Sequence, residues 1–400
     1  MKRKLRHCTF FLISAIFFSF NKKDKTYRIT DFGATTDTSK INTLAIQKTI
    51  DECANDGGGT VVIPQGVFIS GAIFLKPKVN LIIEAGGVLK GSVNPADYPQ
   101  IDSRWEGEEK KWTACLLNII GLENIKISGA GMIDGSGDIW TQKPRTGQRL
   151  GKPRLIGFQN CNHVEITGIS LHNQASWGLF VLYSHNVEIN NLKISAAHNI
   201  PSSDGIDIDS GSKIHITNCD IDVNDDCISI KSGKDEDGLR VNRPSEDILV
   251  EKCHFGYGHG GVAMGSETSG GIRNVTVKDC VADNQNWAPI RFKTQPSRSG
   301  VVENITYENI KLNNTKKAFE FNMAWRMVNP KPAAKVLPVV RNIQIINVNG
   351  TVDAVGDMHG LAGSPIDGVI FKDCKLIAKQ SFVIENTVHV DTSGLKVVKF

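Results

Sequence analysis

The most regular feature of the chain is a short segment in which apolar and polar residues alternate. One copy reads HVEITGI from His163 to Ile169, and the next reads NVEINNL from Asn186 to Leu192. Alternation with a period of two residues is typical of a β-strand that buries one face. Six further copies, with starts spaced 23 to 38 residues apart, begin at Lys213, Asp247, Asn274, Asn304, Asn342 and Gly368.

Recurrence of one short unit indicates a solenoid, in which each unit covers the hydrophobic face of its neighbour. The units contain Gly and Asn turns and show no helical periodicity between the strands, which favours strands throughout each coil. Leucine-rich repeats are the main alternative, but their Leu-x-x-Leu-x-Leu pattern is absent. We therefore predict an all-β protein, a single-stranded right-handed parallel β-helix.

One position of the repeat, six residues after each start, tests this prediction. It holds Ile169, Leu192, Cys219, Cys253, Cys280, Ile310, Val348 and Cys374. Because cysteine alternates there with aliphatic residues, we interpret these cysteines as buried thiols in a core column. The chain has nine cysteines in all, and a disulfide between Cys219 and Cys227 stays open.

Helical spacing of apolar residues occurs ahead of the repeats, between Ile41 and Ile50. The open end of a β-helix has to be covered, so we expect a short N-terminal capping helix near residues 40–54. We expect one catalytic domain, residues 25–400. Polar insertions at about residues 92–114, 141–154 and 232–246 are expected to wall a groove on one face.

Residues 1–22 have the order of an export signal, with four basic residues ahead of a short apolar run. The run is shorter than the ~20 residues of a membrane span. We expect a cleaved signal peptide and an exported chain, periplasmic or secreted, with no membrane span; an uncleaved anchor is the alternative. The net charge of +4 is matched by the charge of this leader, so it gives no argument for nucleic-acid binding.

A second strand in each coil locates the candidate chemistry. Residues in one column of such strands lie about 4.8 Å apart between neighbouring coils. When the strands are aligned on their inward apolar residues, Asp204 and Asp226 are stacked neighbours and Asp225 adjoins them. Burying unpaired carboxylates is costly, so we expect the backbone to bend just before the strand and turn these groups outward.

Three further side chains lie on the same face, two to three coils along: His259, Arg291 and Lys293. Like charges held close raise the pKa of at least one carboxyl group, and a general acid and a general base need separated pKa values. A purely structural interpretation also exists, because acid ladders line β-solenoid turns. In that interpretation Arg291 and Lys293 only balance acids on adjacent rungs: Asp207, Asp209 and Glu320. The convergence on one face favours a site.

Four motifs in this region resemble those of the polygalacturonases, glycoside hydrolase family 28. They are SSDGID from Ser202, NDDC from Asn224, GHG from Gly258 and RFK from Arg291, and the resemblance runs from about Asp31 to the C-terminus. It implies inverting hydrolysis of α-linked galacturonic acid bonds in pectic polysaccharides or oligosaccharides, without a cofactor or metal. The insertion after Lys231 resembles that of bacterial, often exo-acting, members.

The resemblance also implies a role for each site residue. Asp225 corresponds to the general acid, and Asp204 with Asp226 to the pair that activates water. The substrate-binding positions correspond to His259, Arg291 and Lys293. Inversion implies carboxylates roughly 6.5–9.5 Å apart with the water between them. Ser202 and Ser203 stand where the family usually has Asn-Thr, and Phe180 where it often has His, which leaves open a rhamnogalacturonan-directed hydrolase.

Two other classes remain as alternatives. Calcium-dependent pectate lyases share the predicted fold; in a lyase, Asp225 and Asp226 would be metal ligands and Arg291 or Lys293 the proton-abstracting base. A non-catalytic adhesin or tailspike-like binder is the other alternative, and the stacked acids argue against it. We expect a monomeric enzyme whose partner is the pectic substrate, with no nucleic-acid partner.

Overall fold

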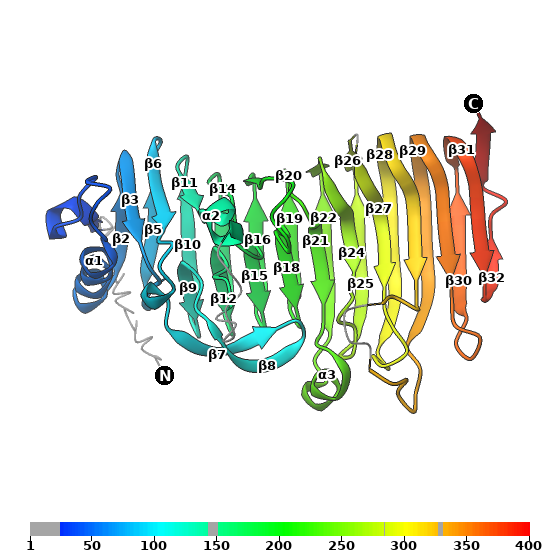
Figure 1. Ribbon diagram of the computed structural model, residues 1–400, viewed down its shortest axis with the longest axis horizontal. Coiled ribbons are helices and arrows are strands. Elements are labelled where there is room, and N and C mark those ends of the chain that lie inside the picture. Colours follow the sequence, from blue (N-terminus) through cyan, green and yellow to red (C-terminus); the bar gives the residue numbers. More distant parts are fainter. Residues whose placement is uncertain (1–24, 143–150, 284, 327–330) are drawn as a thin grey trace, which may run out of the picture.

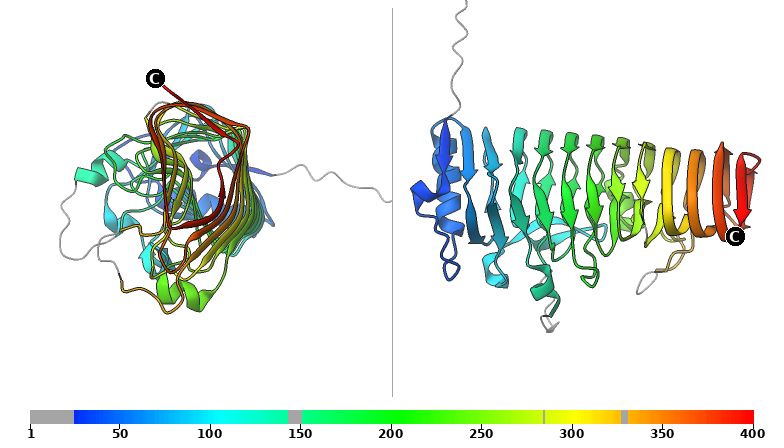
Figure 2. Two further views of the ribbon diagram at one scale, coloured as in Figure 1. Left: turned by 90° about the vertical axis from the view of Figure 1, so that its right-hand side faces the viewer. Right: turned by 90° about the horizontal axis from the view of Figure 1, so that it is seen from above.

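The chain winds into coils that stack along one axis (Figure 1). The computed structural model describes residues 25–142, 151–283, 285–326 and 331–400. Within these residues, one sheet of 31 strands is built by parallel pairing of each strand with the strand one coil further along. The predicted right-handed parallel β-helix is therefore confirmed. Seen along the axis, the coils superpose (Figure 2).

Each coil contributes strands to three faces. The first face contains β1 (Thr26–Arg28), β2 (Gly59–Ile63), β5 (Val79–Ile83), β10 (Glu123–Gly129), β13 (Asn162–Thr167), β16 (His185–Asn190), β19 (Ser212–Thr217), β22 (Ser245–Glu251), β25 (Ile272–Lys278), β30 (Ile366–Lys372) and β32 (Thr387–Asp391). The second contains β3 (Gly66–Ser70), β6 (Gly87–Gly91), β11 (Met132–Asp134), β14 (Ser170–His172), β17 (Lys193–Ser195), β20 (Asp220–Asp222), β23 (His254–Phe255), β26 (Val281–Ala282), β31 (Cys374–Glu385) and β33 (Leu395–Lys399).

The third face carries the strands that were aligned for the candidate chemistry. It contains β4 (Ile73–Phe74), β9 (Leu117–Ile120), β12 (Ile156–Gln159), β15 (Leu179–Leu182), β18 (Ile206–Asp209), β21 (Asp226–Lys231), β24 (Gly258–Met264) and β27 (Asn286–Lys293). Two long strands, β28 (Val301–Asn322) and β29 (Val339–His359), run through all three faces.

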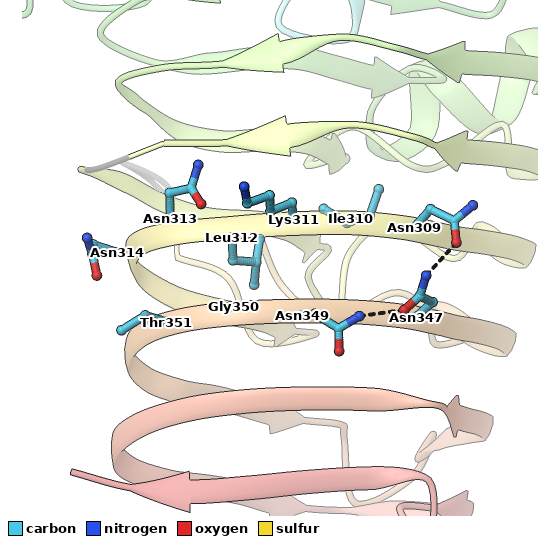
Figure 3. Close-up of a pocket in the computed structure, with 10 residues that line it drawn as sticks. All are labelled: Asn309, Ile310, Lys311, Leu312, Asn313, Asn314, Asn347, Asn349, Gly350 and Thr351. Carbon is cyan, nitrogen blue, oxygen red and sulfur yellow. Dashed lines mark hydrogen bonds between the residues drawn. The ribbon is translucent and has the colours of Figure 1, made fainter.

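The first residue of each repeat adopts a left-handed backbone conformation, with φ between 53° and 67° at all eight starts. Asn tolerates this conformation better than most residues that carry a side chain. The Asn side chains also hydrogen-bond from coil to coil: Asn304 Nδ2 donates to Asn274 Oδ1 over 3.1 Å, and Asn342 donates to Asn304. Figure 3 shows a parallel ladder in which Asn347 donates to Asn309 over 2.8 Å. Turn geometry and ladder together explain the recurring Asn.

The interior of the coils is a continuous apolar core. The cysteine column lies within it, since Cys219, Cys253, Cys280 and Cys374 are each buried and in contact with the core. All eight cysteines of the described residues are buried and free, so the pair left open between Cys219 and Cys227 is not formed. Cys8 lies outside the described residues.

A helix covers the N-terminal end of the β-helix, as predicted. α1 (Thr43–Asn55) buries Ile46, Ile50 and Cys53 against the end of the core. Two short 3₁₀ helices flank the first coils: η1 (Ile29–Phe32) and η2 (Pro95–Asp97). The signal-peptide residues 1–22 lie outside the described residues. No helix in the described ranges is long and apolar enough to cross a membrane.

Most of the insertions project below the coils in Figure 1, whereas the start of the second lies in front of them. The first forms an antiparallel hairpin of β7 (Gln100–Trp105) and β8 (Glu108–Thr113), and the third contains α3 (Asp235–Val241). α2 (Gly137–Gln142) begins the second insertion, and residues 143–150 lie outside the described ranges. A fourth insertion between β28 and β29, residues 323–338, was not predicted.

The Asn ladder generates a prediction for stability. Asn304→Ala removes a residue suited to φ of 58° and two ladder hydrogen bonds, so the free energy of unfolding should fall by about 1–3 kcal/mol. Asn304→Gly restores the backbone preference and should recover part of the loss. Thermal unfolding of the three proteins tests this; equal midpoints for Ala and wild type would contradict it.

Candidate active site

The third face has the register that the sequence alignment predicted. Backbone pairing places Phe180, Asp207, Ser229, Ala263, Arg291 and Glu320 in one column. Alternation breaks at the start of β21, because the consecutive residues Cys227 and Ile228 both pack in the core. Asp226, one residue earlier, therefore faces outward. This is the bend expected from the cost of burying unpaired carboxylates.

Asp226 is buried on this face between two cations. Arg291 Nη1 lies 3.1 Å from Asp226 Oδ1, and Lys293 Nζ lies 2.5 Å from Oδ2. Arg291 Nε also donates to Glu320 Oε2 over 2.5 Å. The buried carboxylate is thereby satisfied on both oxygens, which is the condition for keeping such a charge inside a protein.

The coil between these partners has small residues where the ion pair crosses it. β24 pairs with β21 on one side and with β27 on the other. A Cβ on Gly260 would lie 2.9 Å from Asp226 Oδ1 and 3.2 Å from Arg291 Cδ. Glycine at this position leaves the space through which Arg291 reaches Asp226, a distance of two coils.

In the purely structural interpretation of the sequence, Arg291 and Lys293 neutralise the charges of Asp207, Asp209 and Glu320. Among these acids, the contact exists only to Glu320. Asp207 faces Lys231 Nζ at 3.3 Å instead, and Asp209 accepts from Arg104 Nη1 over 2.7 Å. Both acids point out of the core and are nevertheless buried, Asp207 against Lys231 of β21 and Asp209 under Arg104 of the first insertion.

Asp225 is the most exposed of the three candidate catalytic acids, with 29% of its side chain accessible. Its Oδ1 lies 3.3 Å from Nδ1 of His259, whose side chain is 48% exposed. Burial acts to raise the pKa of Asp225, but the His259 hydrogen bond and the charge of Lys293 outweigh it and hold that pKa well below its usual range. The hydrogen bond to Asp225 raises the pKa of His259.

Asp204 lies buried near Asp225, and its pKa is shifted in the opposite direction. Burial, then the charges of Asp207 and Asp225, raise its pKa well above the usual range. In the free protein the carboxyl group of Asp204 therefore retains a proton at a pH at which Asp225 is ionised. Separated pKa values of this kind are what acid–base catalysis requires.

The three carboxyl groups are closer together than inversion led us to expect. One oxygen from each of Asp204, Asp225 and Asp226 lies within 4.8 Å of the others, against the 6.5–9.5 Å typical of inverting enzymes. Such a trio has the donor atoms of a cation site. Both oxygens of Asp226 already face cations, however, so a calcium ion there would be repelled by Arg291 and Lys293.

A pocket of about 710 Å³ opens over the trio. All six predicted site residues line it. So do four tryptophans that the sequence analysis did not assign to the site: Trp105, Trp177, Trp287 and Trp325. Trp105 and Trp177 stack with ring centroids 4.9 Å apart. Because these tryptophans come from the hairpin, the coils and the fourth insertion, their convergence depends on the fold and could not be seen in sequence spacing.

The insertions are joined to one another at the rim of this pocket. The backbone N–H of Lys234 donates to the Gly107 carbonyl over 2.9 Å, linking the β7–β8 hairpin to the segment before α3. Lys331 of the fourth insertion lies 3.7 Å from Glu108 and 3.5 Å from Asp235. The predicted rim is thus formed by the first and third insertions together with the fourth, which was not predicted; none of the described residues of the second insertion, 141–142 and 151–154, lines the pocket.

A second hollow, of about 560 Å³, lies over the Asn ladder of β28 and β29 (Figure 3). Half of its ten lining residues are asparagines, Asn309, Asn313, Asn314, Asn347 and Asn349, and none of the described residues that line it is a carboxylate or histidine. It has no acid–base pair, so the pocket over Asp225 is the candidate active site.

Comparison with known proteins places this chain in a family. The model of glycosyl hydrolases family 28 matches residues 53–394. A probable polygalacturonase of Vitis vinifera is 29% identical over 85% of this chain and 72% of its own length. An exo-poly-α-D-galacturonosidase of Dickeya chrysanthemi is 28% identical over 73% of this chain, which spans 56% of that protein. The structure of a hyperthermoactive exopolygalacturonase from Thermotoga maritima is similar with a TM-score of 0.82, 28% identity and 92% of each chain covered.

The buried ion pair generates a prediction. Lys293→Met leaves Asp226 with one cation instead of two and removes one charge-assisted hydrogen bond, so the free energy of unfolding should fall by about 1–3 kcal/mol. Adding Asp226→Asn removes the buried charge and should restore much of the loss, giving a favourable coupling energy in a double-mutant cycle. Denaturant unfolding of the four proteins measures it.

Lys335 provides a matched control, because it is exposed and lies outside the pocket lining. Lys335→Met should leave stability within about 0.5 kcal/mol of wild type. Additive effects of Lys293→Met and Asp226→Asn would mean that the two side chains do not interact.

Proposed function

The chain belongs to glycosyl hydrolases family 28, and on that premise we propose that it hydrolyses α-linked galacturonic acid bonds in pectic polysaccharides or oligosaccharides. The observation that carries the proposal is the trio of carboxyl groups within 4.8 Å, with separated pKa values, at the base of a 710 Å³ pocket. A uronate polymer is anionic, and the cations at this pocket suit it.

We assign the general acid to Asp225 and the activation of water to Asp204 and Asp226. The accessibility of Asp225 supports this, since a group that protonates the leaving oxygen has to contact the sugar, whereas Asp204 and Asp226 are buried. His259, Arg291 and Lys293 are proposed as substrate-binding residues. His259 is exposed beside Asp225, and the two cations also hold Asp226 in place.

The pKa order in the free protein is the reverse of what this assignment needs in the complex. Asp225 is ionised in the free protein because of His259 and Lys293. A sugar ring placed over Asp225 would exclude water from it, and desolvation raises the pKa of a carboxyl group. The assignment therefore requires that substrate binding protonate Asp225, either from water or from Asp204.

The lyase alternative fits the site less well. A calcium-dependent lyase would need Asp226 as a metal ligand and Arg291 or Lys293 as a free base. Both cations are already bound to Asp226. Burial acts to lower the pKa of Arg291, but the charges of Asp226 and Glu320 outweigh it and hold that pKa above its usual value. Hydrolysis by the carboxyl groups requires neither a metal ion on Asp226 nor a deprotonated Arg291 or Lys293.

We further propose that cleavage proceeds from a chain end and with inversion. The linked insertions favour action at an end, because an enzyme that cleaves within a polymer needs a groove open on both sides of the bond. Trp105 lines the pocket from the hairpin, and Trp325 lines it from the fourth insertion. Inversion rests on the resemblance to the polygalacturonases.

Export remains a proposal that rests on the sequence of residues 1–22. The substrate supports it, because a pectic polymer lies outside the cell that digests it. Full-length expression followed by N-terminal sequencing of the exported protein would identify the cleavage site.

The role of Asp225 generates a prediction about rate and pH. Asp225→Asn keeps the side-chain size but cannot donate a proton, so kcat should fall by at least ~10²–10⁴. A general acid acts only when protonated, so wild-type kcat should decrease as pH rises through the pKa that Asp225 has in the complex. The Asn variant should lose this alkaline decrease. Near-normal turnover of the variant would refute the assignment, while the thermal midpoint serves as the folding control.

The reaction class generates a second prediction. Polygalacturonan incubated with the protein should release saturated galacturonate monomer or short oligomer from the first minutes, with a slow loss of viscosity. A chelator should not change the rate. The first product should be the β-anomer, because inversion at an α-linkage gives β.

Each measurement tests a different part of the proposed reaction, so each part can be contradicted on its own. An unsaturated, ultraviolet-absorbing product and inhibition by chelator would identify a lyase. A rapid loss of viscosity would identify internal cleavage, and an initial α-anomer would identify retention. If products are released only from rhamnogalacturonan oligosaccharides, the substrate is rhamnogalacturonan rather than polygalacturonan.

A further inference from the structure

The carboxyl groups and cations that line the pocket are mostly committed to one another. Lys231 faces Asp207 at 3.3 Å and Glu267 at 3.2 Å, and both of these acids are buried. Arg291 and Lys293 are committed to Asp226, and Arg291 also to Glu320. A substrate carboxylate that used only these cations would compete with protein carboxylates already in place.

Arg326 is the exception among the lining cations. Within the described ranges, no carboxylate lies at ion-pair distance from its guanidinium group, although it lines the same pocket as Asp225. Its side chain is exposed to solvent. A guanidinium group can bind a carboxylate through two parallel hydrogen bonds, so Arg326 can bind an incoming anion without breaking an existing pair.

The residue before it holds this part of the chain in place. The backbone N–H of Trp325 donates to the Thr294 carbonyl over 2.9 Å. Its ring centroid lies 4.8 Å from Arg291 Cζ and 5.6 Å from Lys293 Nζ. The Trp325 ring therefore packs beside the two cations that bind Asp226, and Arg326 is attached to a segment that is fixed against the site.

We propose that Arg326 binds the carboxylate of a uronate ring held in the pocket and is a specificity-determining residue for uronate over neutral sugars. The proposal rests on the function proposed above and deepens it. Arg326 would act beside His259, Arg291 and Lys293. The last two also stabilise Asp226, whereas Arg326 has no carboxylate partner among the described residues to release before it binds substrate. Glu106 lines the pocket as well and adds negative charge to it, which disfavours an anion wherever no cation compensates.

The test measures binding rather than turnover, so that catalysis does not obscure it. Calorimetry with the Asp225→Asn variant gives the Kd for trigalacturonate and for its carboxyl-reduced counterpart. Adding Arg326→Gln should weaken binding of trigalacturonate by about 10- to 100-fold, the effect of losing charge-assisted hydrogen bonds. Binding of the neutral trisaccharide should change by less than about twofold. Arg326→Lys should retain part of the affinity.

A control variant separates direct contact with the substrate carboxylate from the effect of net charge. Lys335→Gln removes one positive charge from the same insertion outside the pocket and should leave both affinities unchanged. If Lys335→Gln weakens trigalacturonate binding as much as Arg326→Gln does, a long-range field explains the effect and the inference is wrong. It is also wrong if Arg326→Gln affects both sugars equally or neither. If the Asp225→Asn parent binds neither sugar, the proposed function fails and this inference fails with it.

Discussion

The ion pairs of Asp226 with Arg291 and Lys293 are the interaction on which the site depends. They join residues 65 and 67 positions apart in sequence and connect two coils that are not neighbours. A charge without a partner at this depth would be prohibitively unfavourable. The ion pairs therefore constrain the register of β21, β24 and β27 and require the absence of a side chain at Gly260. Catalytic geometry and strand register are thus one requirement rather than two.

Around that charge, the positions of protons follow from burial and neighbouring charges. Asp225 and Asp204 have the same side chain, but His259 contacts one and buried acids surround the other. Their pKa values therefore move in opposite directions. The resemblance to polygalacturonases assigns chemical roles by position, whereas the electrostatics of the free protein describe the state before substrate arrives. The two descriptions agree if bound substrate covers Asp225 and raises its pKa, so that it becomes protonated.

The fold was predictable because its determinants are local. A few consecutive residues determine each left-handed turn, such as those at Asn186 and Asn304, and the alternating strand that follows it. Stacking of the coils then fixes which residues share a column. The site was predictable as far as those columns reach, which includes Asp204, Asp225 and His259. Trp325, Arg326 and the cover of Arg104 over Asp209 were missed, because they depend on which insertion folds over which coil. Nothing in local spacing encodes that contact.

The coils and the rim of linked insertions are stabilised by different numbers of contacts. Each coil rests on its neighbour through contacts repeated along the whole solenoid, while the pocket wall depends on a few contacts between distant segments, such as Gly107 with Lys234 and Arg104 with Asp209. A protease that nicked the β7–β8 hairpin at its tip would leave the backbone ladders of the coils intact. The cut protein would keep the circular-dichroism spectrum and apparent size of the native one while its pocket wall came apart, so in storage or digestion its activity can be lost long before its fold.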